Sequence, residues 1–190
     1  MVRILEEYAE KNNIPIMQKD GIEFMCRYII DNNIKNVLEI GTAIGYSAIK
    51  MALSKKDVMV TSIERDKNMY DEATKNIQKF GLTNRIKIIY GDALDIVLNK
   101  KYDLIFIDAA KSQYINFFEK YKNNLDENGV IITDNLSFHG LVEDDSTTHN
   151  RNTKQLIRKI RKYIQFLKDN KDYQTDFYSI GDGISVTKKS

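Results

Sequence analysis

The chain has 190 residues, of which 42% are hydrophobic and 29% are charged, and its net charge is +2. These values are typical of a soluble globular protein and predict a single domain over residues 1–190. No apolar run approaches the ~20 residues of a membrane-spanning helix, and the acidic N-terminus lacks the apolar core of a signal peptide. The only cysteine, Cys26, excludes an internal disulfide and a zinc site built from several cysteines. We therefore expect a cytoplasmic protein that does not bind membranes.

Helices and strands are predicted to alternate along most of the chain. Two helices, at about 2–12 and 18–32, form an N-terminal extension over residues 1–33, and the second has apolar residues at the spacing of one helical face. Further strands are predicted at 36–40, 58–64, 85–91, 103–108 and 130–135, with helices at 46–54, 66–80, 93–99 and 112–125. After a polar segment at 136–150, a basic helix is predicted at 152–168. Two last strands follow, joined by a turn at Gly181-Asp182-Gly183.

Continuous apolar strands separated by helices indicate a parallel sheet that is covered by helices on both faces. The two last strands predict an antiparallel hairpin at one edge of this sheet. The expected fold is therefore α/β, with a mostly parallel seven-stranded sheet. The N-terminal helices would form a cap over the site or a dimerisation element.

Oxygen-bearing side chains stand where two of the apolar strands end. Asp108 ends YDLIFID, and Asp134 and Asn135 end GVIITDN. Open α/β sheets bind ligands at the carboxyl ends of their strands. Two carboxylates and one amide suit an oxygen-preferring cation such as Mg²⁺ or Ca²⁺, although either aspartate alone could simply end a strand or cap a helix.

Other strand ends carry features of a nucleoside site. The turn in VLEIGTAIGYSAIK holds Glu39, Gly41 and Gly45, and glycines there let the backbone approach a ligand closely. Their spacing differs from the dinucleotide fingerprint, and the Lys-Ser/Thr pair of a P-loop is missing. Glu64 ends the second strand, where an acid can accept hydrogen bonds from ribose hydroxyls. Gly91-Asp92-Ala93 ends the third, where a polar group can meet an adenine edge.

Basic residues gather between Arg151 and Lys171, with Asp169 as the single acid among them. The solvated face of a helix would explain this run, and so would a surface that contacts nucleic-acid phosphates. Both histidines, His139 and His149, lie just before it, and His139 either borders the site or is an ordinary loop residue. The candidate RNA-binding residues are Arg151, Lys154, Arg158, Lys159, Arg161 and Lys162.

Taken together, LEIGTAIGYS, SIERD, GDA, FIDAAKSQY and ITDN resemble the class I S-adenosylmethionine-dependent methyltransferases. More narrowly, the chain is similar to the metal-dependent O-methyltransferases that include catechol and caffeoyl-CoA O-methyltransferases. This resemblance covers nearly the whole chain. It implies a Rossmann-like fold, S-adenosylmethionine (SAM) as cofactor, a divalent cation such as Mg²⁺, Mn²⁺ or Ca²⁺, and a homodimer.

Within that family, ITDNLSFHGLV and the following basic helix are most similar to the bacterial tRNA 5-hydroxyuridine methyltransferases. Their product is 5-methoxyuridine at the wobble position, so this narrower resemblance implies the tRNA anticodon arm as partner. Ala109 and Ala110 replace the bulky residues, including a tryptophan, that follow the metal aspartate in catechol enzymes. Their small size favours a wider mouth.

The resemblance also implies roles for single residues. Asp108, Asp134 and Asn135 would hold the metal, and Asp108 and Lys111 would be catalytic. Lys111 would accept the hydroxyl proton or steady the oxyanion, unless it is an ordinary solvent-exposed lysine. The implied cofactor-binding residues are Met17, Glu39, Gly41, Ser47, Glu64, Asp92, Ala93, Asp108 and Tyr114.

Three other functions fit parts of this pattern. A catechol-like phenol has two adjacent oxygens, as 5-hydroxyuracil does, so metal chemistry accommodates either substrate. A non-catalytic RNA-binding protein could keep the same fold, but it would need neither the metal ligands nor Lys111. An NAD-dependent dehydrogenase is disfavoured by the glycine spacing.

Overall fold

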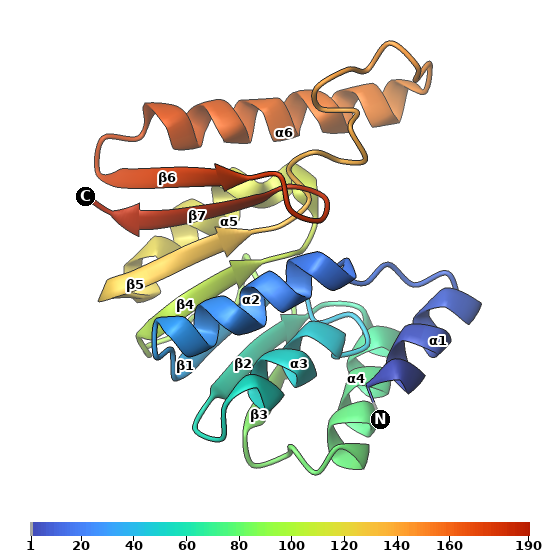
Figure 1. Cartoon of the computed structure of the whole chain (residues 1–190), viewed down its shortest axis with the longest axis vertical. Coiled ribbons are helices and arrows are strands. Elements are labelled where there is room, and N and C mark those ends of the chain that lie inside the picture. Colours follow the sequence, from blue (N-terminus) through green and yellow to red (C-terminus); the bar gives the residue numbers. More distant parts are fainter. Residues whose placement is uncertain (1) are drawn as a thin grey trace.

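A computed structural model describes residues 2–190 and contains a seven-stranded sheet in the order β3-β2-β1-β4-β5-β7-β6 (Figure 1). The strands are β1 (Asn36–Ile40), β2 (Met59–Glu64), β3 (Ile86–Tyr90), β4 (Tyr102–Ile107), β5 (Leu125–Thr133), β6 (Tyr173–Tyr178) and β7 (Ile184–Lys189). The strands β1 to β5 are parallel, whereas β7 pairs antiparallel with both β5 and β6. The predicted Rossmann-like sheet with its C-terminal hairpin is thus confirmed.

Helices pack on both faces of the sheet and bury two apolar clusters against it (Figure 1). One face carries α1 (Arg3–Lys11), α2 (Lys19–Asp31), α3 (Tyr46–Ser54) and α4 (Lys67–Lys79), and the other carries α5 (Tyr114–Tyr121) and α6 (Arg151–Asp169). The first cluster includes Met25 and Ile49, and the second includes Phe118 and Tyr163, all with 1% exposure or less. Within residues 2–190, no helix has the length and apolar character needed to cross a membrane.

The predicted short helix at 93–99 is wrong. Asp92 accepts the backbone N–H of Leu94 at 2.9 Å and closes a turn, after which the chain runs without helical structure. Leu94, Ile96 and Leu98 are partly buried, whereas the residues between them are exposed, Val97 to 80%. Burial therefore alternates with a period of two residues, which suits an extended segment and not a helix.

Two predicted boundaries also change around α5. The expected helix at 112–125 is divided into a 3₁₀ turn η1 (Lys111–Gln113), α5 itself and a second 3₁₀ turn η2 (Lys122–Asn124). The strand expected at 130–135 begins earlier, at Leu125, and ends at Thr133. Asp134 and Asn135 therefore lie in the loop just beyond β5. Their side chains need not point to opposite faces of the sheet, as successive residues of a strand do.

The register of the parallel strands places the key strand ends beside one another. Ile40 of β1 is the partner of Ile107 of β4, and Ile107 is the partner of Thr133 of β5. The next residues along these three strands are Gly41, Asp108 and Asp134. Residues from three distant parts of the sequence thus meet at one edge of the sheet.

Candidate active site

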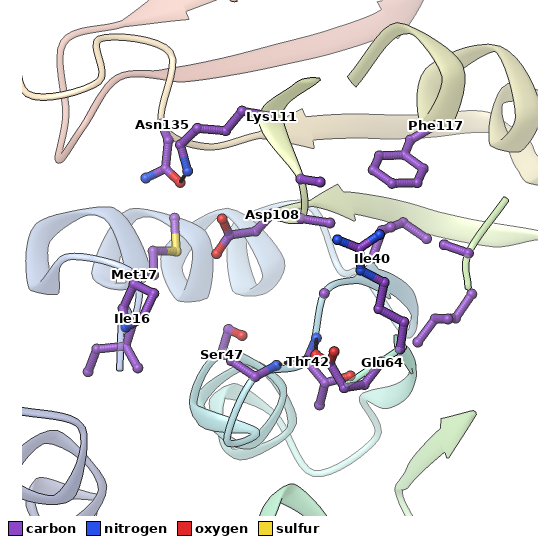
Figure 2. A pocket seen from close by; sticks show the side chains of 18 of the residues that line it. Ile16, Met17, Ile40, Thr42, Ser47, Glu64, Asp108, Lys111, Phe117 and Asn135 are labelled. Atoms are coloured by element: carbon purple, nitrogen blue, oxygen red, sulfur yellow. Dashed lines mark hydrogen bonds between the residues drawn. The ribbon is translucent and has the colours of Figure 1, made fainter. Parts of the chain in front are cut away.

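A cavity of about 530 Å³ opens at the carboxyl ends of the parallel strands (Figure 2). It is walled by the loops that follow β1 to β5 and by residues 15–18, the segment that joins α1 to α2. The segment between the two N-terminal helices therefore forms part of the cavity wall. The predicted site residues that line the cavity are Met17, Gly41, Ser47, Glu64, Asp92, Ala93, Asp108, Lys111 and Asn135.

The turn after β1 fits glycine alone at its first position. Gly41 has φ +99°, and a Cβ atom there would lie 2.3 Å from the Asp108 carbonyl oxygen. The turn passes directly over the end of β4, and this packing leaves no room for a side chain. The two N–H groups that follow, of Thr42 and Ala43, donate to Glu64 Oε2 at 3.1 and 2.8 Å.

Glu64 is thereby held in one orientation at the cavity wall. Its second oxygen, Oε1, accepts the N–H of Asp66 at 2.8 Å, so both carboxylate oxygens have backbone donors. Each carboxylate oxygen can accept more than one hydrogen bond, so the oxygens of Glu64 can still accept hydrogen bonds from a ligand in the cavity. Figure 2 shows Glu64 beside Thr42 on the floor of the cavity.

Glu39, expected to contact the cofactor, lies beneath the cavity in the described structure and does not line it. Its carboxylate is fully buried and accepts hydrogen bonds from the hydroxyls of Ser47 and Ser62. Burial raises the pKa of Glu39 to about 8. Its direct role is therefore to fix Ser47, which does face the cavity, to the end of β1.

We expect the substitution Glu39→Gln to flatten the dependence of unfolding free energy on pH. The pKa of Glu39 is raised in the folded state from 4.5 to about 8. Its stabilising contribution is therefore complete below pH 4.5 and is lost as the pH rises toward 8. One proton changes the slope by roughly 1.4 kcal/mol per pH unit. Urea denaturation at several pH values measures this slope, and an unchanged slope in the variant would contradict the assignment.

Asp108, Asp134, Asn135 and Lys111 come together at the opposite side of the cavity. Figure 2 shows Lys111 and Asn135 side by side above Asp108. Lys111 Nζ lies 2.6 Å from Asn135 Oδ1. Asn135 has φ +62°, a left-handed conformation that asparagine tolerates better than most residues. Asp134 is 2% exposed, and its Oδ1 atom has no hydrogen-bond partner within residues 2–190.

The electrostatics of this cluster suit a bound cation. The pKa of Asp134 is raised to about 7, first by burial and then by the nearby Asp108 carboxylate. Burial also raises the pKa of Asp108, against the opposing charge of the Lys111 ammonium. Within the described residues, no three His, Cys, Asp or Glu side chains are placed to hold a metal together. A site here therefore depends on the amide oxygen of Asn135, and this oxygen donor set with its unpartnered buried oxygen fits a hard divalent cation.

Tyr114 has a different position from the one expected. It is 1% exposed and does not line the cavity in the described structure. Its hydroxyl donates to the backbone oxygen of Asp134 at 2.9 Å, and its ring packs edge-on against Tyr163 with centroids 5.2 Å apart. Tyr114 therefore supports the loop after β5, because α5 turns its ring toward α6 and away from the cavity.

The candidate RNA-binding residues on α6 divide into two groups. Arg161 is held by the preceding loop, since its Nε donates to Val142 O at 2.8 Å and its guanidinium contacts Asp145 at 3.3 Å. The others have no acidic partner within residues 2–190. They are Arg151, Lys154, Arg158, Lys159 and Lys162.

The comparisons with known proteins agree with this geometry. A family model described as O-methyltransferase matches residues 1–190. The chain belongs to this O-methyltransferase family.

Several relatives of this O-methyltransferase match over most of their length. A solved structure from Staphylococcus aureus, provisionally described as a caffeoyl-CoA O-methyltransferase, is 40% identical, with a TM-score of 0.95 and coverage of 100% of this chain and 92% of that one. The caffeoyl-CoA O-methyltransferase of Populus kitakamiensis is 30% identical over 193 residues, which is 97% of this chain and 82% of the relative. An O-methyltransferase from Bacillus cereus, solved in complex with SAH, shares the fold with a TM-score of 0.84, at 24% identity and with coverage of 100% and 90%.

Some walls of the O-methyltransferase cavity were not predicted from the sequence. Phe117 lines it from α5, Phe138 lines it from the loop after β5, and Asp182 lines it from the β6–β7 turn. His139 lines it too, and bordering the site was one of its two predicted positions. Asp182 is 4% exposed and accepts the backbone N–H of His139. The glycines on both sides of Asp182 predicted a turn, but nothing local to that turn indicated that it would meet a loop some forty residues away.

Proposed function

We propose that this protein transfers the methyl group of SAM to a hydroxyl that has a second oxygen beside it. Asp108, Asp134 and Asn135 would hold a divalent cation for this reaction. The observation that carries the proposal is the buried Oδ1 of Asp134, which has no partner in residues 2–190 and belongs to the residue directly before Asn135, a lining residue of the cavity. An unpartnered buried carboxylate oxygen is costly, and a cation would satisfy it.

The features that support SAM as cofactor lie at the other end of the cavity. Gly41 lets the turn after β1 pack over the end of β4 at the cavity wall, and Glu64 offers acceptors for ribose hydroxyls. Ala93 and Phe117 provide an apolar slot that suits a purine ring, with Asp92 at its edge. SAH, the demethylated product of SAM, is bound in the related structure from Bacillus cereus.

Different parts of the site would have different roles in the methyl transfer. A bound divalent cation favours the oxyanion form of a hydroxyl that coordinates it. Lys111 stands at Asn135, where its ammonium can steady the oxyanion by charge or, in the neutral amine form, its nitrogen can take up the hydroxyl proton. Residues 15–18 and the loop after β5 hold the two reactants together, and this positioning supplies much of the rate enhancement in a direct methyl transfer.

We infer that the substrate is 5-hydroxyuridine at the wobble position of tRNA, methylated to 5-methoxyuridine. Its O5 and O4 atoms are adjacent oxygens of the kind that a cation can chelate. Ala109 and Ala110 line the cavity with small side chains, which leaves room for a nucleotide at the mouth. The unpaired cations of α6 give this end of the molecule a surface for RNA phosphates. The second candidate is a catechol-like phenol, favoured by the caffeoyl-CoA specificity in the name of the Populus relative.

Two substrates offered side by side test both parts of the proposal. Purified protein is incubated with radiolabelled SAM and Mg²⁺, either with tRNA that carries 5-hydroxyuridine or with catechol, with and without a chelator. We expect chelator-sensitive label in the wobble nucleoside of tRNA. Label in catechol alone would contradict the tRNA substrate and leave O-methyl transfer standing. No label in either would contradict methyl transfer to adjacent-oxygen substrates.

A further inference from the structure

A second, smaller hollow lies between η1 and the middle of α6. Its volume is about 210 Å³, and its lining includes Lys111, Ser112, Lys159 and Lys162. Lys111 lines this hollow and also the large cavity. A ligand group in the hollow would therefore be separated from the reaction centre by one side chain.

Two of the cationic side chains that line the hollow form no salt bridge within the described part of the chain. Lys159 and Lys162 are exposed, and no carboxylate in residues 2–190 forms a salt bridge with either of them. Arg161, between them in sequence, is by contrast bound to Asp145. Like charges that converge on one hollow repel one another, so the arrangement favours an anion between them.

The floor of the hollow contributes shape and no free polar group. Tyr114 and Tyr163 line it, and both hydroxyls already have partners, Asp134 O at 2.9 Å and Thr133 Oγ1 at 2.8 Å. Recognition would therefore come from the lysine ammonium groups, the Ser112 hydroxyl and the Asn116 amide, which also line the hollow. The volume is many times the ~10–15 Å³ that one water molecule needs, so a tetrahedral phosphate fits.

We propose that this hollow binds a phosphodiester of the RNA substrate that flanks the methylated nucleoside. The inference rests on the proposed function, since it assumes that the nucleoside occupies the large cavity. The base would then lie on one side of Lys111, and the phosphate next to the methylated nucleoside would lie on the other side. Binding of this phosphate would fix which nucleotide of the RNA enters the large cavity. Lysines are compact point charges suited to a phosphate.

The test compares a pair of lysines in the middle of α6 with a pair at the C-terminal end of this helix and just beyond it. Lys159→Gln with Lys162→Gln removes the charges at the hollow. Lys168→Gln with Lys171→Gln removes the same charge at and just beyond the C-terminal end of α6. Binding of a fluorescent anticodon stem-loop carrying 5-hydroxyuridine is measured by anisotropy at several salt concentrations. We expect the first pair to weaken binding about tenfold or more and to lower the slope of log K against log [salt] by about one, and the control pair to change binding less than twofold.

An uncharged linkage identifies the phosphate. A stem-loop with a methylphosphonate on one side of the target nucleoside should bind the wild type and the hollow variant about equally, whereas a distant methylphosphonate should preserve their difference. Equal weakening by both lysine pairs, or a difference that no flanking methylphosphonate removes, would overturn the inference. So would displacement of the RNA by coenzyme A that depends on the hollow lysines, since the ligand would then be a phosphorylated small molecule. Because binding is measured without turnover, absence of methyl transfer to tRNA would count against the proposed function alone.

Discussion

The substitution Asp134→Asn is expected to lower kcat by about 1000-fold and, at the same time, to stabilise the protein at pH 8. Loss of one anionic ligand weakens the binding of the cation that favours the substrate oxyanion. This cation stabilises the transition state by several kcal/mol, which corresponds to about three powers of ten in rate. The pKa of Asp134 is raised to about 7, so its charged form costs folding free energy above that pH. An asparagine of the same shape removes that cost. Initial rates at saturating SAM and Mg²⁺, with thermal melts at pH 6 and pH 8, measure both effects.

A matched control is available on β5, the strand that precedes Asp134. Asp126 lies on β5 and is exposed, and Asp126→Asn should leave both the rate and the melting temperature nearly unchanged. SAM binding to the Asp134→Asn variant, measured by calorimetry, should stay within a few-fold of wild type. A variant that keeps more than a tenth of the wild-type rate would refute the metal assignment at Asp134.

The substitution Glu64→Ala is expected to weaken SAM binding about 100-fold. The variant loses the acceptor for the ribose hydroxyls and leaves the N–H groups of Thr42 and Ala43 without their present partner. Each unsatisfied donor costs about 1–3 kcal/mol, and the loop that approaches the cofactor would lose its fixed shape. Calorimetric titration with SAM or SAH measures the loss directly.

The isosteric variant Glu64→Gln separates charge from hydrogen bonding. This variant retains one side-chain oxygen, so its affinity for SAM should lie between the affinities of the wild type and of Glu64→Ala. The kcat at saturating SAM should fall much less than the affinity, because Glu64 lies away from the reacting oxygens. Wild-type affinity in the alanine variant would exclude Glu64 from the cofactor site.

Much of the fold follows from local patterns in the sequence. The run from Leu104 to Ile107 is continuously apolar and fully buried in a parallel sheet, and the apolar residues from Val37 to Ile40 are fully buried beside it. The helix predicted at 66–80 forms as α4, and Asp66 caps it by accepting the N–H groups of Asn68 and Met69. The segment at 93–99 was misjudged because a short apolar run looks alike in a helix and in an extended chain. The alternation arises because Leu94, Ile96 and Leu98 pack against the second core cluster, which forms only in the folded chain.

The sequence by itself determined which residues could form the site, because polar side chains at the ends of apolar strands must gather at one edge of a parallel sheet. Asp108, Glu64 and Asn135 stand at or just after such strand ends, and all three line the cavity. Only the tertiary structure decided which neighbours stand at the surface of the cavity and which support it from below. Glu39 is support because Ser47 of α3 covers it, and Tyr114 is support because its ring packs against Tyr163 of α6. Asp182 is a wall because the β6–β7 hairpin folds back beside β5. These contacts join segments far apart in the chain, and their geometry depends on how whole helices and strands pack.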